Sequence, residues 1–494
     1  ENWQKAFEVA GFKNAIICKD PPSKEEDPDF SPEDIRYSVI RYVASTTRNA
    51  MGPSVSDPRS GEIIESDIIW YHNHLRSYRN RFLIETAASN PKARTLETSE
   101  EDIGEMMEMV ISHEVGHALG FPHNMGASSS YEVENYRKAD FTQKEGISAS
   151  IMDYARFNYI AQPEDKGVRY IRQMGPYDNY AVNWGYRLLP DAKTPEDEVP
   201  TLNKWVEAKA GDARFRFGNQ GTTFDPSSQT EDIGNDPVRA STYAVKNLKY
   251  VAKNLASWTS NKTNDYEDLI ELNDELLSAW SRYVGHVTTT VGGVYEQYAK
   301  PNQQIASYVV VPKATQQTAV KWLLANAFSN VDWLINREVV THHMMGYTDR
   351  IRSLQASPLN RMLSFETFAR LDNSGLSTAN AYKTVDLCQD LRQGLWSELA
   401  TGAKMDGFRR NIQKAYVERM KYLLTEQMTP SPFAREFYNV SQSDVRSIVR
   451  GELKTLLASL QTAKGKYADK ETAYHLADCI DRIQTALNPT KAQK

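Results

Sequence analysis

The spacing of apolar and polar residues divides this chain into a mixed first part and a helical second part. Residues 2–11 follow a helical period, and 175–186 read as a capped helix. Alternating stretches predict strands, and an interruption by Gly52 and Pro53 marks one of them as an edge strand. The predicted strands cover residues 14–19, 36–43, 50–56 and 62–72. Helices and short strands in this order indicate an α+β domain.

From residue 238 to the end, nearly every segment follows a helical period. The predicted helices cover residues 243–258, 266–298, 316–328, 385–399, 409–424 and 445–462, with one extended break at 307–312. Three prolines and an acidic cluster in residues 190–200 suggest a linker, and 214–217 could form a strand. We therefore predict an α+β domain over 1–190, a loop-rich linker over 191–237, and an α-helical region of unknown role over 238–494.

Composition narrows the class of protein without identifying a function. A length of 494 residues suggests two to four domains. The net charge of −6 gives no reason to expect a nucleic acid as partner, and no apolar run is long enough to span a membrane. The three cysteines, Cys18, Cys388 and Cys479, are too few and too scattered for a disulfide framework or a thiolate metal site.

The chemistry is concentrated in one short motif, His-Glu-x-x-His-x-x-Gly-x-x-His, at residues 113–123. A capping pattern at Ser99 opens a helix that carries His113 and His117 one turn apart, on the same face. Gly120 suits a left-handed helix end, after which His123 can approach a shared ion from another side. Three imidazoles with an open fourth position are typical of a catalytic zinc site.

Chance is a weak explanation for this motif. Three of the nine histidines fall in it, so an accidental match is expected roughly once in 10⁵ such chains. Zinc would lower the pKa of bound water from about 15.7 toward 7, and Glu114 could accept its proton and pass it to a leaving amine. The residues alone therefore predict hydrolysis of an amide, by a peptidase or by a small-molecule amidase or deacylase.

The motif, followed by Ser-Ile-Met152-Asp-Tyr154, resembles the metzincin clan of zinc endopeptidases. The resemblance implies a twisted mixed sheet, a zinc helix and a Met-turn in which Met152 lies under the ligands. It implies that Tyr154 approaches the zinc and stabilises the oxyanion. By analogy, a peptide substrate would add to the edge strand at Ala50, Met51 and Gly52.

Stretches from Trp3 onward also resemble a family of large bacterial secreted zinc-dependent metalloproteases with a helical C-terminal region. That resemblance implies an extracytoplasmic location: periplasmic, cell-surface or secreted. Its members carry further sequence upstream, and this chain starts at Glu1 rather than at a methionine. We therefore expect a preceding N-terminal portion of the full-length protein that packs against this chain.

Other candidate sites and functions are weaker. The acidic loop at residues 21–32 could bind Ca²⁺, although a solvated turn is favoured. His72 and His74 could share an ion on a strand, whereas the adjacent His342 and His343 have poor geometry for one. A catalytically silent binding protein that retains the zinc site is the remaining alternative, and the intact Glu114 argues against it.

Overall fold

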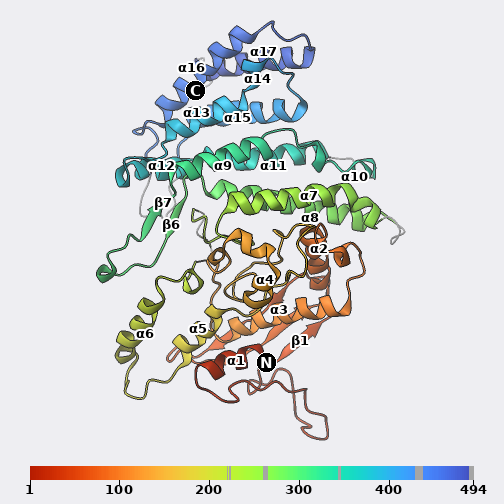
Figure 1. Ribbon diagram of the computed structural model, residues 1–494, viewed down its shortest axis with the longest axis vertical. Coiled ribbons are helices and arrows are strands. Elements are labelled where there is room, and N and C mark those ends of the chain that lie inside the picture. Colours follow the sequence, from red (N-terminus) through yellow and green to blue (C-terminus); the bar gives the residue numbers. More distant parts are fainter. Residues whose placement is uncertain (220, 222–223, 260–264, 343–345, 429–437, 489–494) are drawn as a thin grey trace. The chain divides into compact units, whose positions relative to one another are not determined.

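Figure 1 shows the computed structural model of the chain. It describes all residues except 220, 222–223, 260–264, 343–345, 429–437 and 489–494. Packing divides the chain into two compact units, one formed by Glu1–Thr222 with Ser227–Trp280 and the other by Thr223–Pro226 with Ser281–Lys494. The catalytic domain that we predict over residues 1–190 lies within the first unit.

The first unit contains a small mixed sheet in the order β1-β5-β2. Strand β1 (Ile40–Val43) pairs parallel with β5 (Ile68–Tyr71), and β2 (Ala50–Met51) pairs antiparallel with the other edge of β5. Strands β3 (Ser54–Ser56) and β4 (Ile63–Ser66) form a separate hairpin. The sheet and helices together confirm the predicted α+β class.

The strands are shorter than the alternating pattern predicted. No strand forms at residues 14–19, and the segment predicted over 36–43 is a strand only from Ile40. The predicted strand over 62–72 is two strands that meet at Asp67. The carboxylate of Asp67 accepts a hydrogen bond from the backbone N–H of Val39 at 2.9 Å, so the chain changes from the β3–β4 hairpin to the sheet at this residue. Period-two alternation does not reveal such a change of partner strand.

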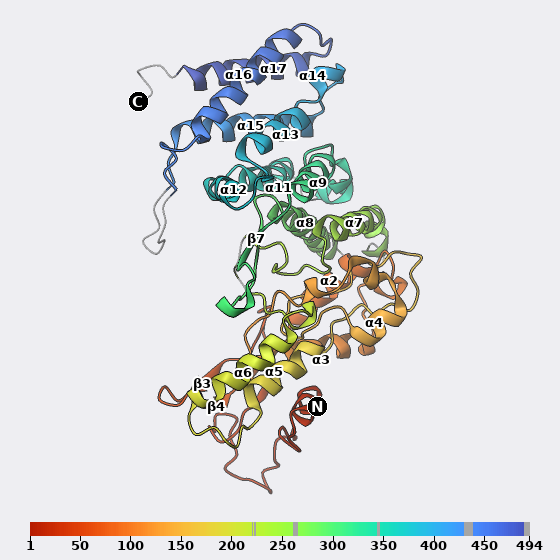
Figure 2. The same ribbon diagram turned by 60° about the vertical axis from the view of Figure 1, so that its left-hand side comes forward.

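The first unit also contains several helices. They are α1 (Asn2–Val9), α2 (His74–Thr86), α3 (Glu100–Ala118), α4 (Ala139–Glu145), α5 (Pro176–Tyr186), α6 (Pro195–Lys209) and α7 (Pro237–Thr259). Helix α1 packs against α3 and α5, as both views show (Figures 1 and 2). Helix α2, which the sequence did not lead us to predict, packs against α3 and α7 and buries Tyr78, Phe82 and Leu83.

Between α5 and α7, a helix forms that we did not predict, and a possible strand does not form. The segment expected as linker contains α6, because Thr194 and Asp197 cap a helix that starts at Pro195. None of the residues of α6 is buried, so packing does not account for its presence. The possible strand at 214–217 is instead a single 3-10 turn over Ala213–Phe215, which the Asp212 side chain caps.

The second unit is mainly helical. Helix α8 (Glu267–Thr289) contains the boundary between the units and is followed by the hairpin β6 (Val294–Glu296) and β7 (Tyr308–Val310). The remaining helices are α9 (Lys313–Asn326), α10 (Arg337–His342), α11 (Tyr347–Met362), α12 (Phe365–Ser377), α13 (Thr384–Leu395), α14 (Glu398–Thr401), α15 (Gly407–Thr425), α16 (Val445–Ala463) and α17 (Lys470–Leu487). Helices α13, α15, α16 and α17 pack together (Figure 2).

Candidate metal centre and active site

Helix α3 brings the first two histidines to one face. The Ser99 hydroxyl accepts from the backbone N–H of Asp102 at 3.1 Å, which is the cap that the sequence predicted. The buried face of α3 consists of Met106, Met109, Val110, Ser112, His113 and Gly116. The imidazole of His113 is only 4% exposed, and its ring centroid lies 4.8 Å from that of His117.

The turn after α3 brings the chain back toward His113 and His117. Gly120 has a φ of 85°, in the left-handed region that favours glycine. Its N–H donates to the His117 carbonyl at 2.9 Å, and the Phe121 N–H donates to the Gly116 carbonyl at 3.0 Å. This pair of bonds is the Schellman motif, which ends a helix and reverses the chain. The ring of His123 consequently lies 4.5 Å from that of His117.

The three imidazoles converge on one point. The Nε2 atom of His123 is 3.0 Å from Nε2 of His117 and 3.2 Å from Nε2 of His113. Nitrogens bound at about 2.0–2.1 Å to one tetrahedral zinc would lie about 3.3 Å from each other, so the spacing fits this ion. Among the residues that the structure describes, these three form the only group of His, Cys, Asp or Glu side chains able to hold a metal.

Hydrogen bonds on the outer nitrogens fix the tautomers. Nδ1 of His113 lies 2.7 Å from the Ile151 carbonyl, and Nδ1 of His117 lies 2.9 Å from the Phe121 carbonyl. A carbonyl can only accept, so each Nδ1 carries the proton and each Nε2 presents a lone pair. Burial lowers the pKa of both side chains, which keeps them neutral. Neutral imidazoles whose lone pairs face one another fit a cation between them.

The Met-turn lies directly under α3. Met152 is 2% exposed, and its carbonyl accepts from the Asn124 N–H at 3.0 Å. A Cβ built on Gly116 would lie 2.2 Å from Met152 Sδ, so only glycine lets the thioether approach the helix this closely. The carbonyl of the preceding residue, Ile151, is the one that orients His113.

Buried Asp178 of α5 holds the Met-turn in place. Its carboxylate accepts from the Ser150 hydroxyl at 2.6 Å and from the backbone N–H groups of Ile151 and Gly175 at 2.8 and 2.7 Å. Asp153 likewise accepts from the Ser128 N–H at 2.6 Å. Burial raises the pKa of each carboxyl to about 6. The Asp178 carboxylate thereby ties α5 to the segment that orients His113.

The carboxylate of Glu114 lies beside edge strand β2. Gly52, directly after β2, lies close to it, and a Cβ on Gly52 would lie 3.3 Å from Glu114 Oε2. Burial raises the pKa of Glu114 to about 7, although the charges of Arg156 and Arg172 and the nearby Gly52 backbone oppose the rise. A carboxyl with a pKa near 7 can both accept and donate a proton at neutral pH.

Tyr154 lies against the histidines, and an arginine lies against Tyr154. Its ring centroid is 4.4 Å from that of His123 and 5.4 Å from that of His113. The Arg156 guanidinium lies 4.6 Å from the centre of the Tyr154 ring. Arg156 Nε is 3.2 Å from a Glu231 carboxylate oxygen, and its Nη1 donates to the Tyr78 hydroxyl. This cation–π contact is anchored by residues far away in sequence.

The three residues predicted to bind substrate lie next to the site. Ala50 and Met51 form β2, which pairs on one side with β5, and its other side has no strand partner among the described residues. Met51 is 39% exposed, whereas Ala50 is buried. Gly52 follows β2 and contacts Glu114. An open strand edge therefore leads to the general-base candidate.

The weaker candidate sites do not come together. The Nδ1 atom of His72 contacts the Tyr42 hydroxyl, whereas His74 begins α2 and packs between Trp70 and Tyr78. The acidic loop at residues 21–32 forms no metal-sized group within the described residues, so Ca²⁺ is unsupported. His342 ends α10, and His343 lies outside the described residues.

Sequence reasoning missed the arginines near the site. Arg156 follows Tyr154 by two residues, which a motif search could have noticed. Arg172 is 2% exposed, and its Nε and Nη1 atoms have no hydrogen-bond partner in the described part of the chain. Its charge lowers the pKa of both His113 and Glu114. No local pattern signals a buried, unpaired guanidinium, since its surroundings come from distant segments.

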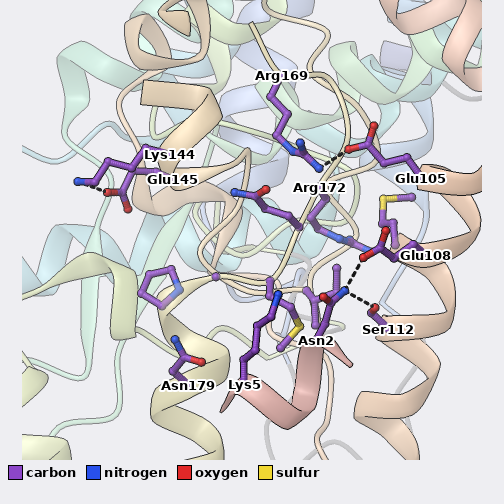
Figure 3. A pocket seen from close by; sticks show the side chains of 16 residues that line it. Asn2, Lys5, Glu105, Glu108, Ser112, Lys144, Glu145, Arg169, Arg172 and Asn179 are labelled. Carbon is purple, nitrogen blue, oxygen red and sulfur yellow. Dashed lines mark hydrogen bonds and ion pairs between the residues drawn. The ribbon is translucent and has the colours of Figure 1, made fainter. Parts of the chain in front are cut away.

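A cavity of about 460 Å³ lies between α1, α3, α4 and α5 (Figure 3). Seven of the residues that line it are charged, and four of these form two ion pairs with each other. Arg169 pairs with Glu105, Lys144 with Glu145 at 3.0 Å, and the Asn2 amide donates to Glu108 at 2.8 Å. None of the three metal-ligand candidates lines this cavity, so it is distinct from the metal centre.

Comparisons with known proteins add one match. A family model described as Met-zincin matches residues 95–402, more than half of the chain. No curated protein and no solved structure matches. Among the described residues, no helix is both long and apolar enough to cross a membrane. On the family match, together with the histidine cluster over a Met-turn, this chain belongs to the Met-zincin family.

Proposed function

We propose that this protein is a zinc-dependent endopeptidase that hydrolyses peptide bonds. Membership in the Met-zincin family supports a metalloprotease in general. The observation that carries the proposal is the convergence of three Nε2 atoms next to Glu114, with Nδ1 of His113 and of His117 held by a backbone carbonyl. His113, His117 and His123 would hold the ion.

Zinc in this position would supply an acidified water and an electrophile for the substrate carbonyl. Glu114 accepts the proton of the attacking water at its carboxylate and donates it to the nitrogen of the leaving amine. Its half-buried position favours both steps, because a carboxyl with a pKa raised to about 7 changes protonation state readily at neutral pH. Gly52, which lies against Glu114, limits where that side chain can point.

Tyr154 would stabilise the oxyanion that forms when water attacks. Its phenol ring lies against His123 and His113, so its hydroxyl is a candidate donor to the negatively charged oxygen. Burial raises the pKa of Tyr154, which keeps the phenol protonated and able to donate. Gly120 and Met152 serve the site indirectly, Gly120 by reversing the chain and Met152 by packing under α3.

The open edge of β2 favours a peptide over a small amide as substrate. An extended peptide could pair with Ala50, Met51 and Gly52 through main-chain hydrogen bonds, which recognise a backbone whatever its side chains. A small non-peptide amide would leave that edge unused. The proposed location outside the cytoplasm, by contrast, rests only on the resemblance to secreted bacterial proteases.

The test combines a metal assay with a cleavage assay. Purified protein is expected to contain about one zinc per chain, by elemental analysis, and to cut an unfolded protein internally, by mass spectrometry of the fragments. Glu114→Gln should retain zinc and lose cleavage. Glu101→Gln, on an exposed position of the same helix, is the matched control and should retain both.

Four outcomes would contradict the proposal. Protein without zinc would remove the metal centre, and cleavage unaffected by Glu114→Gln would remove the assigned base. Hydrolysis of small acyl amides without any internal cleavage of proteins would favour the amidase or deacylase alternative. Zinc binding with no hydrolysis of either substrate class would favour a binding protein.

A further inference from the structure

The N-terminal helix α1 inserts one side chain, Trp3, beneath the metal centre. Its indole is 2% exposed, and its Nε1–H donates to the backbone carbonyl of Ser112 at 2.7 Å. Ser112 directly precedes His113 in α3. A helical carbonyl has a second lone pair besides the one used within the helix, and the indole satisfies it in a buried place.

The same indole contacts the turn that leads from His117 to His123. Its ring stacks on Phe121 with centroids 5.3 Å apart and an interplanar angle of 10°. The Phe121 carbonyl is the acceptor for Nδ1 of His117. Trp3 therefore contacts the neighbour of one candidate ligand and the hydrogen-bond partner of another.

Gly116 brings Trp3 and the Met-turn together. A Cβ on Gly116 would lie 2.8 Å from Trp3 Cζ2 and 2.2 Å from Met152 Sδ. The two side chains fill the space beside the backbone of the residue that precedes His117. Glycine in a helix interior costs about 1 kcal/mol relative to alanine, and this close packing is the reason that the site requires it.

Helix α1 is itself fixed to α3. The Asn2 side chain donates to Glu108 at 2.8 Å and to the Ser112 hydroxyl at 3.2 Å, as the dashed lines in Figure 3 show. Phe7, one helical turn after Trp3, packs edge-to-face on Tyr186, whose hydroxyl donates to the Leu119 carbonyl at 2.7 Å. Contacts before and after Trp3 in α1 thus hold this helix in place.

We infer that Trp3 is a positioning residue for the metal centre, which holds α3 and the turn at Phe121 at the spacing that makes the three Nε2 atoms converge. This inference deepens the proposed function, since it concerns the same zinc site. Groups that orient metal ligands through hydrogen bonds and packing typically change metal affinity 10- to 100-fold when removed. Trp3 does so by packing on two ligand-bearing segments at once.

The experiment measures zinc affinity in the full chain, by competition with a chromophoric chelator at fixed pH. Trp3→Leu removes the stacking and the hydrogen bond and should weaken zinc binding about 10- to 100-fold. Trp3→Phe keeps an aromatic ring but loses the donor, and a smaller weakening is expected. Trp70→Leu is the control, because Trp70 is equally buried in the same unit and its indole nitrogen has no partner among the described residues.

The control should unfold at a lower temperature than wild type and bind zinc within about twofold of it. Trp3 variants that lose thermal stability but bind zinc as tightly as wild type would overturn the inference alone. If Trp3→Leu does not fold, Trp3→Phe decides the question by the same measurement. Wild-type protein that takes up no zinc would overturn the proposed function and this inference together.

Discussion

The backbone of Gly52 lies against Glu114, so the end of an edge strand touches the residue that we assign as general base. A Cβ on Gly52 would lie 2.8 Å from the Glu114 carbonyl oxygen, which is too close for any side chain. A glycine at this position therefore lets the strand proposed to bind substrate lie close to the residue proposed to transfer the proton.

Gly52→Ala tests this contact. Either β2 or Glu114 must move to make room for the methyl group, and small displacements of catalytic groups are costly to rate. We expect kcat/KM for an unfolded protein substrate to fall about 10- to 100-fold while zinc content stays near one per chain. Gly61→Ala is not a suitable control because its φ is positive, so Gly104→Ala on α3 is used. Unchanged kcat/KM in Gly52→Ala would contradict the prediction.

Gly116→Ala and Gly104→Ala form a matched pair within α3. Alanine favours a helix by about 1 kcal/mol over glycine at both positions. At Gly104 nothing lies within 4 Å of the new methyl group, so stability should rise. At Gly116 the methyl group meets Met152 and Trp3, and overpacking of this kind costs about 1–3 kcal/mol. Urea unfolding should therefore shift in opposite directions, and equal shifts would refute the packing argument.

Arg156 and Tyr154 should act as a unit. Tyr154→Phe removes the proposed oxyanion donor and should lower kcat about 100-fold. Arg156→Met removes the cation stacked on the ring, which is worth about 0.5–2 kcal/mol, and should lower kcat by a smaller factor. In the double variant the Arg156 effect should disappear, because no hydroxyl remains to be positioned.

Arg137→Met is the control for this cycle. Arg137 also lies over a tyrosine ring, that of Tyr243, at 4.9 Å, and pairs with Asp165 at 2.8 Å, but it has no contact with Tyr154. Its kcat should match wild type. Additive effects of Arg156→Met and Tyr154→Phe would show that Arg156 does not act through Tyr154.

His475 in the second unit predicts a pH-dependent stability. Its ring is 4% exposed, and burial lowers its pKa to about 4, with the charges of Lys414 and Arg410 acting in the same direction. The unfolded chain binds this proton near pH 6.5. The folded state therefore keeps its full stability above that pH and loses part of it as the pH falls toward 4. The free energy of unfolding falls by as much as about 3 kcal/mol over this pH range.

The measurement is the free energy of unfolding in urea between pH 7 and pH 4. His475→Gln should remove part of the slope that wild type shows in this window, because glutamine does not titrate. It can still bond Gln413, whose amide oxygen lies 2.8 Å from Nε2 of His475. Parallel slopes in the two proteins would contradict the assignment of the titration to His475.

The sequence by itself determined the parts of the site whose geometry is local. Spacing along α3 puts His113 and His117 on one face, the Ser99 cap starts the helix, and Gly120 ends it with a left-handed residue. Each of these features depends on interactions within a few residues, so the local sequence predicts it directly. The α+β class followed in the same way from helical and alternating periods.

Only the tertiary structure decided what surrounds those ligands. Ile151 reaches His113 across 38 residues, Trp3 reaches Ser112 across 109, and Arg156 reaches Glu231 across 75. The change of strand partner at Asp67 and the burial of α2 are likewise settled by distant segments. Local propensity does not specify which remote segment fills a given space, because that depends on how the whole unit packs. The ligands could therefore be read from the sequence, whereas the groups that orient them appear only in the fold.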